Sequence, residues 1–206
     1  PGVYNDTILA GLDYLLMEMG KRKMVAVLYL NNSWEWSGGY GYYLEQAGLG
    51  KAPRPDDDGY PAFMNFVAQY ASCDKAHQLF YDYVRFILTR TNRYTKKKYK
   101  DDPAIMSWQI GNEPRAFIKE QLPAFEKWLG EASKLIRSLD GNHLISIGSE
   151  GKWGCEGELD CWERICADRN VDYCNIHLWP YNWSWARKDH LLEDLGVSCQ
   201  NTKEYI

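Results

Sequence analysis

The chain has 206 residues, of which 45% are hydrophobic and 25% are charged, so it is long enough for one large core or two small ones. Its formal net charge is −4, and no basic stripe interleaves with aromatic residues, which argues against nucleic-acid binding. No run of residues approaches the ~20 apolar positions that a membrane-spanning helix needs.

The predicted elements begin with an amphipathic helix over 7–23, in which apolar residues recur at three- and four-residue spacing. An almost wholly apolar β-strand over 24–30 follows, and such a strand suggests a sheet covered on both faces. The strand ends in a polar and aromatic loop over 31–39. Residues 40–73 are expected to form a long excursion with one short helix near 62–70.

Helices and strands alternate through the rest of the chain. The pattern predicts helices over 75–92, 122–139, 159–168 and 186–205, and strands over 104–111, 143–148 and 171–177. Asp74 is expected to cap the first of these helices, and Pro123 suits the first turn of the second. Strict alternation predicts βαβ units in a parallel sheet, either a (β/α)8 barrel or an open doubly wound sheet. An open sheet would usually carry a glycine-rich phosphate-binding turn, and the sequence has none.

Several charged or sulfur-containing residues are assigned no chemistry of their own. The basic run 90–100 is interpreted as the exposed end of helix 75–92, and the acidic residues 56–58 as an exposed loop without the spacing of a calcium site. His143 and His190 are expected at the surface or at helix caps, and Trp108 in the core. The six cysteines include no Cys-x-x-Cys pair, so a zinc site is not indicated. Buried free thiols and one or two disulfides both remain open.

Aromatic residues are unusually frequent, at 15% of the chain, with nine Trp and fifteen Tyr. This composition fits either a tryptophan-rich core or a cleft whose flat aromatic walls suit sugar rings. Polar and aromatic side chains follow the predicted strands directly, as Asn32 with Trp34, Asn112 with Glu113, Glu150, and His177 with Trp179. Because the carboxyl ends of parallel strands meet at one edge, these side chains predict a site there.

The segment MSWQIGNEPR places a carboxyl group directly after an apolar strand. Pro114 then ends the strand, because proline has no amide hydrogen to donate. A carboxyl group at such a position is desolvated, which favours its protonated form, raises its pKa and suits a general acid. The residues alone leave a second interpretation open, in which Glu113 forms a structural ion pair with Arg115.

The segment WQIGNEPR resembles the strand that carries the acid/base residue of glycoside hydrolase family 5, a family of (β/α)8-barrel glycosidases. Four longer segments resemble the endo-β-mannanase subfamily in the right order, namely LNNSWEWSGGYGYYLEQAG, DDPAIMSWQIGNEPRAF, ISIGSEG and NIHLWPYNW. Asn-Glu-Pro alone is a modest signal, whereas the four segments together extend the resemblance over essentially the whole chain.

The resemblance implies that Glu113 is the acid/base, that Asn112 holds the 2-hydroxyl of the reacting sugar, and that His177 lies near the nucleophile. The residues implied to line the cleft are Asn32, Trp34, Trp179 and Trp183, with Glu150 as a non-nucleophilic residue of the same face. The family reaction is retaining: a second carboxylate attacks the anomeric carbon while the acid/base protonates the leaving oxygen and later activates water. No metal or cofactor is implied.

The resemblance also implies a single partial catalytic domain over 1–206, truncated at both ends. The family nucleophile is a glutamate at the end of the seventh strand, and the four predicted strands correspond roughly to strands 3 to 6 of the TIM barrel. The chain alone is therefore expected to be inactive. The parent would be an extracellular, cell-surface or periplasmic enzyme that cuts mannan, glucomannan or galactomannan. A cellulase-like β-glycanase and a non-catalytic carbohydrate-binding protein are the alternatives.

Overall fold

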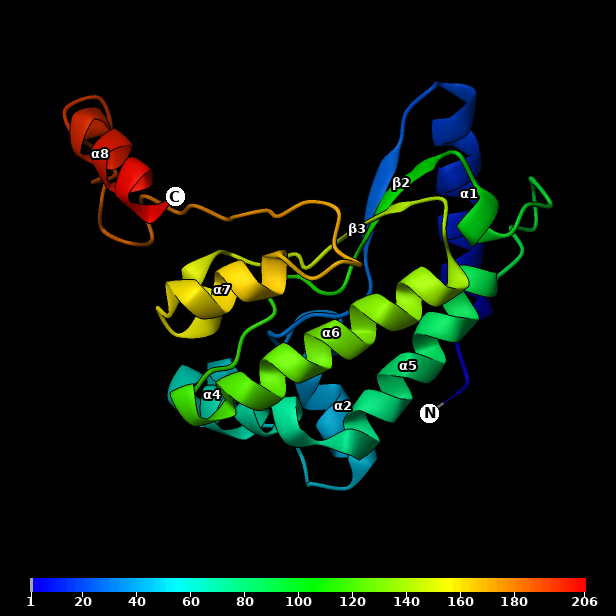
Figure 1. The fold of residues 1–206 in the computed structure, drawn as a ribbon, viewed down its shortest axis with the longest axis horizontal. Helices are drawn as coiled ribbons and strands as arrows, with labels where there is room; N and C mark the ends of the chain where they lie inside the picture. The colour runs from blue at the N-terminus through cyan, green and yellow to red at the C-terminus, as the bar shows by residue number, and fades with distance from the viewer. Residues whose placement is uncertain (1) are drawn as a thin grey trace.

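A three-stranded parallel sheet forms the centre of the computed structural model, which describes residues 2–206 (Figure 1). Its strands are β1 (Ala26–Tyr29), β2 (Ile105–Gln109) and β3 (Leu144–Ser146), in the order β1-β2-β3. Leu28 lies opposite Trp108, and Trp108 lies opposite Ile145. The expected parallel arrangement is confirmed.

Helices connect and flank the strands. The α-helices are α1 (Asp6–Lys21), α2 (Gly39–Ala47), α3 (Pro55–Asp58), α4 (Tyr60–Val67), α5 (Asp74–Thr89), α6 (Leu122–Leu139), α7 (Leu159–Cys166) and α8 (Leu195–Tyr205). Short 3-10 helices are η1 (Ala68–Ser72), η2 (Tyr99–Asp101), η3 (Lys119–Gln121) and η4 (Lys152–Cys155). Helices α5 and α6 run side by side, whereas α8 stands apart at the end of an extended segment (Figure 1). No helix among residues 2–206 is long and apolar enough to cross a membrane.

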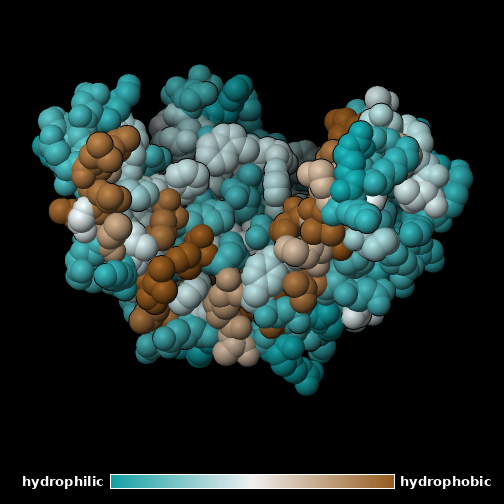
Figure 2. Space-filling model, turned by 90° about the horizontal axis from the view of Figure 1, so that it is seen from above, coloured by the Kyte–Doolittle hydropathy of each residue, from teal (hydrophilic) through white to brown (hydrophobic). Residues whose placement is uncertain are grey.

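The two faces of the sheet differ in burial. On the face that packs against helices, Trp108 and Ile145 are fully buried. They belong to the same hydrophobic core as Trp128 of α6, which is also buried. On the other face Val27 and Leu144 remain 40% and 42% exposed. Figure 2 shows hydrophobic residues in several separate areas of the face that it draws. The expectation of two covered faces is therefore met on one face only, because the open face is the one that a closed barrel would turn inward.

The predicted fourth strand over 171–177 is wrong. The segment follows β3, and the amide of Asp172 donates to the carbonyl of Ile145 at 2.8 Å. However, the side chain of Asp172 accepts from the amide of Ile145 at 2.7 Å, and that of Asn175 accepts from the amide of Gly148 at 3.0 Å. Because side chains occupy positions where a strand would offer main-chain carbonyls, no β-ladder forms.

Other differences lie where short elements interrupt the chain. Helix α2 was not predicted, and the acidic residues 56–58 belong to the one-turn helix α3 rather than to a loop. Asp74 is the first residue of α5 and makes no capping bond, since Cys73 occupies the cap position. Within the predicted helix 186–205, only Leu195–Tyr205 is helical.

The basic run 90–100 is not an exposed helix end, because α5 stops at Thr89. The guanidinium of Arg90 donates to both carboxylate oxygens of the fully buried Asp13, at 3.0 and 2.7 Å. The buried hydroxyl of Tyr99 donates to the same carboxylate at 2.6 Å. These bonds tie the segment after α5 to α1.

His143 was expected at the surface or at a helix cap, and the structure shows it buried. One ring nitrogen lies 2.7 Å from Asp140 Oδ2 and the other lies 3.0 Å from the carbonyl oxygen of Asp102, so both nitrogens face acceptors. Burial lowers the pKa of His143, but the bond to Asp140 outweighs this and leaves the pKa raised. Burial raises the pKa of Asp140, whereas bonds from His143 and Trp108 bring it down to about 2. The pair is therefore a buried imidazolium–carboxylate pair.

We expect this pair to make stability depend on pH. A histidine whose pKa is raised on folding stabilises the protein fully below its unfolded value of about 6.5, and this contribution is lost as pH rises through the folded value. Urea unfolding of wild type and His143→Gln should therefore give a difference in unfolding free energy that shrinks from pH 6 to pH 9. A difference that is constant or grows over this range would contradict the charged pair.

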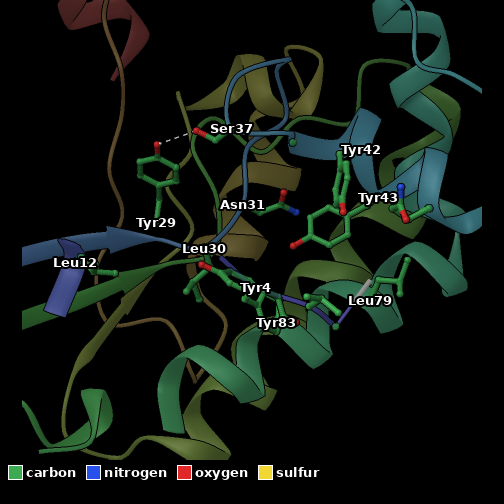
Figure 3. Close-up of a pocket in the computed structure, with 14 residues that line it drawn as sticks. Tyr4, Leu12, Tyr29, Leu30, Asn31, Ser37, Tyr42, Tyr43, Leu79 and Tyr83 are labelled. Atoms are coloured by element: carbon green, nitrogen blue, oxygen red, sulfur yellow. Dashed lines mark hydrogen bonds between the residues drawn. The ribbon is translucent and has the colours of Figure 1, made fainter. Parts of the chain in front are cut away.

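A cavity of ≈ 520 Å³ lies beside β1 and is rich in tyrosine. Figure 3 shows Tyr4, Tyr42 and Tyr43 around it, with Asn31 and Ser37 from the loop after β1. Among residues 2–206, β1 pairs with β2 alone, so its other edge is free next to this cavity. A further strand paired with that edge would cover the cavity, and we do not assign it as the functional site.

Candidate functional site

The backbone at the end of β2 holds Glu113 in an unusual conformation. Its φ is +50°, in the left-handed region that non-glycine residues rarely adopt and that costs on the order of 1–3 kcal/mol. The amide of Asn112 donates to the carbonyl of Asn31 at 2.8 Å, and the amide of Glu113 donates to the carbonyl of Gly148 at 2.9 Å. The hydroxyl of Ser33 donates to the carbonyl of Glu113. Bonds to both neighbouring strand ends thus fix the direction of this side chain.

Three side-chain donors surround the carboxylate of Glu113. Trp34 Nε1 donates to Oε2 at 2.7 Å, while His177 Nδ1 lies 2.8 Å from Oε1. Trp179 Nε1 also reaches Oε1, at 3.4 Å. The donors come from the loop after β1 and from the extended segment after α7, so residues far apart in the sequence converge on one group.

These donors reverse the expected acidity of Glu113. Burial raises its pKa, as the sequence predicted, but the hydrogen bonds from His177 and Trp34 outweigh burial, and the pKa lies below its ordinary value. The expectation of a raised pKa is therefore wrong for this chain. The group is a carboxylate at neutral pH unless another negative charge is brought close to it.

His177 is oriented in turn by Asn175. The side-chain amide of Asn175 lies 3.4 Å from His177 Nε2 and donates to the carbonyl of Ser149 at 3.1 Å. If Nε2 accepts from Asn175, the ring proton resides on Nδ1 and is directed at Glu113. Asn175 thereby links the extended segment to the loop after β3.

A cavity of ≈ 650 Å³ opens at this carboxylate. It is lined by Trp34, Trp36, Tyr60, Met64, Asn112, Glu113, Arg115, Glu150, His177, Trp179, Asn182 and Trp183. Seven of the eight residues that the sequence assigned to the site are therefore brought together on its walls. The exception is Asn32, which is 3% exposed and accepts from the amide of Trp34 at 3.1 Å beneath the wall. Asn32 was expected to line the cleft, but it does not. Its side chain instead stabilises the turn that leads to Trp34.

Arg115 does not pair with Glu113, so the purely structural interpretation of Glu113 fails. The guanidinium of Arg115 instead contacts Glu150 Oε1 at 3.3 Å and Glu156 Oε1 at 3.0 Å. Burial raises the pKa of Glu150 to about 7, even though Arg115 opposes this shift. Glu150 is thus a largely buried acid among the residues that line the cavity.

Several cavity residues were missed by sequence reasoning. Trp36 lies two positions after Trp34 and could have been inferred from the repeated indole in WEW. Tyr60 and Met64 come from α4 in the long excursion, where no local pattern indicates a cleft wall. Asn175, which contacts His177 behind the cavity lining, was missed because its segment has the composition of a strand.

None of the six cysteines lines this cavity. Cys166 and Cys174 form a disulfide between the end of α7 and the extended segment, while Cys73, Cys155, Cys161 and Cys199 are free. Within residues 2–206, no group of three His, Cys, Asp or Glu side chains is placed to hold a metal ion. The chemistry that the cavity offers is that of one oriented carboxylate between indole rings.

The chain matches the model of the family described as glycoside hydrolase family 5 β-mannosidase-like, over residues 1–206. It is 33% identical over 199 residues to mannan endo-1,4-β-mannosidase 4 of Oryza sativa subsp. japonica, an alignment that covers 90% of this chain and 41% of that relative. The chain thus spans less than half of that relative's length.

Two solved structures from Rhizomucor miehei are also similar. A glycoside hydrolase family 5 mannosidase in complex with mannosyl-fructose superposes with a TM-score of 0.85 at 33% identity, covering 100% of this chain and 49% of that chain. An endo-1,4-β-mannanase superposes with a TM-score of 0.69 at 25% identity, covering 90% of this chain and 55% of that one. The fold is accordingly a partial (β/α)8 barrel, with the three strands described above rather than four.

Proposed function

Because the chain belongs to glycoside hydrolase family 5, in its β-mannosidase-like group, we propose that the full-length protein hydrolyses β-1,4-mannosidic linkages with retention of configuration. The observation that carries this proposal is the carboxylate of Glu113, held by Trp34 and His177 inside a cavity with aromatic walls. Substrates would be mannan, glucomannan or galactomannan, whose sugar rings suit the indole faces.

In this reaction Glu113 protonates the leaving oxygen and later accepts a proton from water, while Asn112 binds the 2-hydroxyl of the reacting sugar. A second carboxylate must attack from about 5–5.5 Å away. The other acidic residue that lines the cavity, Glu150, is paired with Arg115 and is 5% exposed, which makes it a poor nucleophile. We place the nucleophile in a part of the full-length protein beyond this chain.

A second carboxylate would also explain how Glu113, whose pKa is lowered in this chain, can act as a general acid. A like charge at that distance disfavours ionisation, so it would raise the pKa of Glu113 and supply the proton that a general acid needs. The three donors around Glu113 would then hold the carboxylate form that acts as base in the second step. The site alternates between the two forms during one turnover.

A second candidate is the release of single mannose units from chain ends. It is favoured by the closer superposition on the Rhizomucor miehei mannosidase than on the endo-mannanase of the same organism. The two modes differ in products. Internal cleavage lowers the viscosity of a mannan solution at once, whereas release from chain ends yields mannose with little change in viscosity.

The test is a panel of mannan, cellulose and xylan incubated with the full-length protein. We expect hydrolysis of mannan, with the β-anomer formed first in an NMR time course, and no turnover by the purified 206-residue chain. Preference for cellulose would favour a cellulase-like enzyme, and mannan binding without hydrolysis would favour a carbohydrate-binding protein. Turnover by the chain alone would refute the placement of the nucleophile.

For location, we propose an extracellular, cell-surface or periplasmic protein. The support is the disulfide between Cys166 and Cys174, because disulfides persist in oxidising compartments. A mannan polymer is also met outside the cell that degrades it. Fractionation of the source cells with an antibody against the chain tests this placement.

A further inference from the structure

Helix α8 has a single buried residue, Tyr205, in its last turn. The end of α8, marked C in Figure 1, is directed toward the body of the molecule. There the hydroxyl of Tyr205 donates to the carbonyl of Glu150 at 2.6 Å, a bond that is buried. The rest of α8 is largely exposed, with Leu195 and Val197 at 57% and 56%. Tyr205 is therefore the one buried side chain through which α8 meets the site, and Ser198 Oγ adds a bond to the carbonyl of Trp185 at 3.1 Å.

The ring of Tyr205 fits closely over the loop after β3. A Cβ atom on Gly151 would lie 2.8 Å from the ring, and Gly151 has a φ of +103° that favours glycine. The ammonium of Lys152, the first residue of η4, lies 5.1 Å from the ring centroid. Hydrogen bond, ring contact and cation together hold residues 150–152 against α8.

The same ring also contacts the segment that carries Trp183. Its centroid lies 5.1 Å from that of Trp183 and 6.2 Å from that of Trp185. Trp183 and Glu150 both line the cavity that contains Glu113. Tyr205 thus joins two wall segments that come from separate parts of the chain.

We propose that Tyr205 is a positioning residue, which fixes Glu150 and Trp183 relative to each other for the part of the substrate that extends beyond the reacting sugar. The proposal rests on the proposed glycosidase function. Tyr205 does not line the cavity, so it acts through its neighbours rather than on the substrate. Its loss should weaken productive binding of long substrates and spare the chemistry at Glu113.

The experiment compares Tyr205→Phe and Tyr205→Leu in the full-length protein, with Tyr94→Phe as a control at an exposed tyrosine. Phenylalanine keeps the ring and removes one hydrogen bond, so kcat/KM on mannohexaose should fall roughly 2- to 10-fold. Leucine also removes the ring contacts and should give a larger fall, mainly through KM. Turnover of an aryl β-mannoside, which fills only the position next to Glu113, should stay within about twofold of wild type.

Hydrogen exchange provides a readout that needs no activity. Amides of 149–152 and 183–185 should exchange faster in Tyr205→Leu than in wild type, while α5 and α6 keep their protection. Equal losses on both substrates, with exchange raised throughout the molecule, would reduce Tyr205 to a general structural role and overturn the proposal, as would no change on either substrate. If wild type cleaves neither substrate, the proposed function fails, and unchanged exchange in the two segments would then refute the role of Tyr205 separately.

Discussion

Replacing Glu113 by glutamine should lower kcat of the full-length enzyme on mannan by about 10²- to 10⁴-fold, the range for loss of a general acid/base. Glutamine keeps the shape of the side chain and can still accept from Trp34, so the fold and the cavity should persist. The amide has no proton of suitable acidity to give to the leaving oxygen. The measurement is kcat on mannohexaose by product release.

The leaving group separates proton donation from a general loss of structure. Dinitrophenolate is a weak base that leaves without being protonated, so the first step of hydrolysis of a dinitrophenyl β-mannoside should be far less impaired by Glu113→Gln than that of mannohexaose. Glu120→Gln, at an exposed position outside the cavity, is the matched control and should behave as wild type. Equal loss on both substrates would remove Glu113 from the role of acid/base.

The positive φ of Glu113 makes the backbone of the site less stable than an extended conformation would be. A strained non-glycine residue persists only where surrounding bonds over-determine it, and here these come from the carbonyls of Gly148 and Asn31 and the hydroxyl of Ser33. The strain directs the carboxylate away from the ladder and into the cavity. No pattern in the sequence indicates this conformation, because Asn-Glu-Pro also fits an extended strand end.

Regular elements with strong periodicity were predicted well from the sequence. Helix α6 begins and ends at the residues predicted, because an apolar stripe and Pro123 in its first turn agree with each other. The parallel pairing of the strands and the edge at which Glu113 lies were predicted from the alternation of helices and strands. The segment 171–177 failed because Asp172 and Asn175 replace ladder bonds with side-chain bonds, an exchange that β-like composition conceals.

The acidity of Glu113 could not be predicted for a related reason. Desolvation is local and can be inferred from an apolar strand, whereas the opposing hydrogen bonds come from Trp34 and His177, 79 and 64 residues away in the sequence. The sign of a pKa shift depends on both contributions. Composition and local pattern indicate only the desolvation and not the hydrogen bonds.

For stability, the largest effect should come from Asp13. Asp13→Ala should lower the unfolding free energy by about 3–5 kcal/mol, because it leaves the guanidinium of Arg90 without its carboxylate inside the protein. The side chain of Arg90 is only 11% exposed, and without Asp13 its one remaining carboxylate partner is the exposed Asp6, at 3.3 Å. The hydroxyl of Tyr99 loses its acceptor as well. Urea unfolding followed by tryptophan fluorescence measures the change.

The exposed pair of Asp82 and Arg85 provides the control, with side chains 56% and 49% exposed. Asp82→Ala should change the unfolding free energy by no more than about 1 kcal/mol, since solvent screens such pairs. A double variant, Asp13→Leu with Arg90→Met, removes both charges and should be more stable than Asp13→Ala, because no unpaired charge remains buried. If the double variant has the lower unfolding free energy of the two, the ion pair itself stabilises the fold. The loss in Asp13→Ala would then not come from an arginine left without its buried partner.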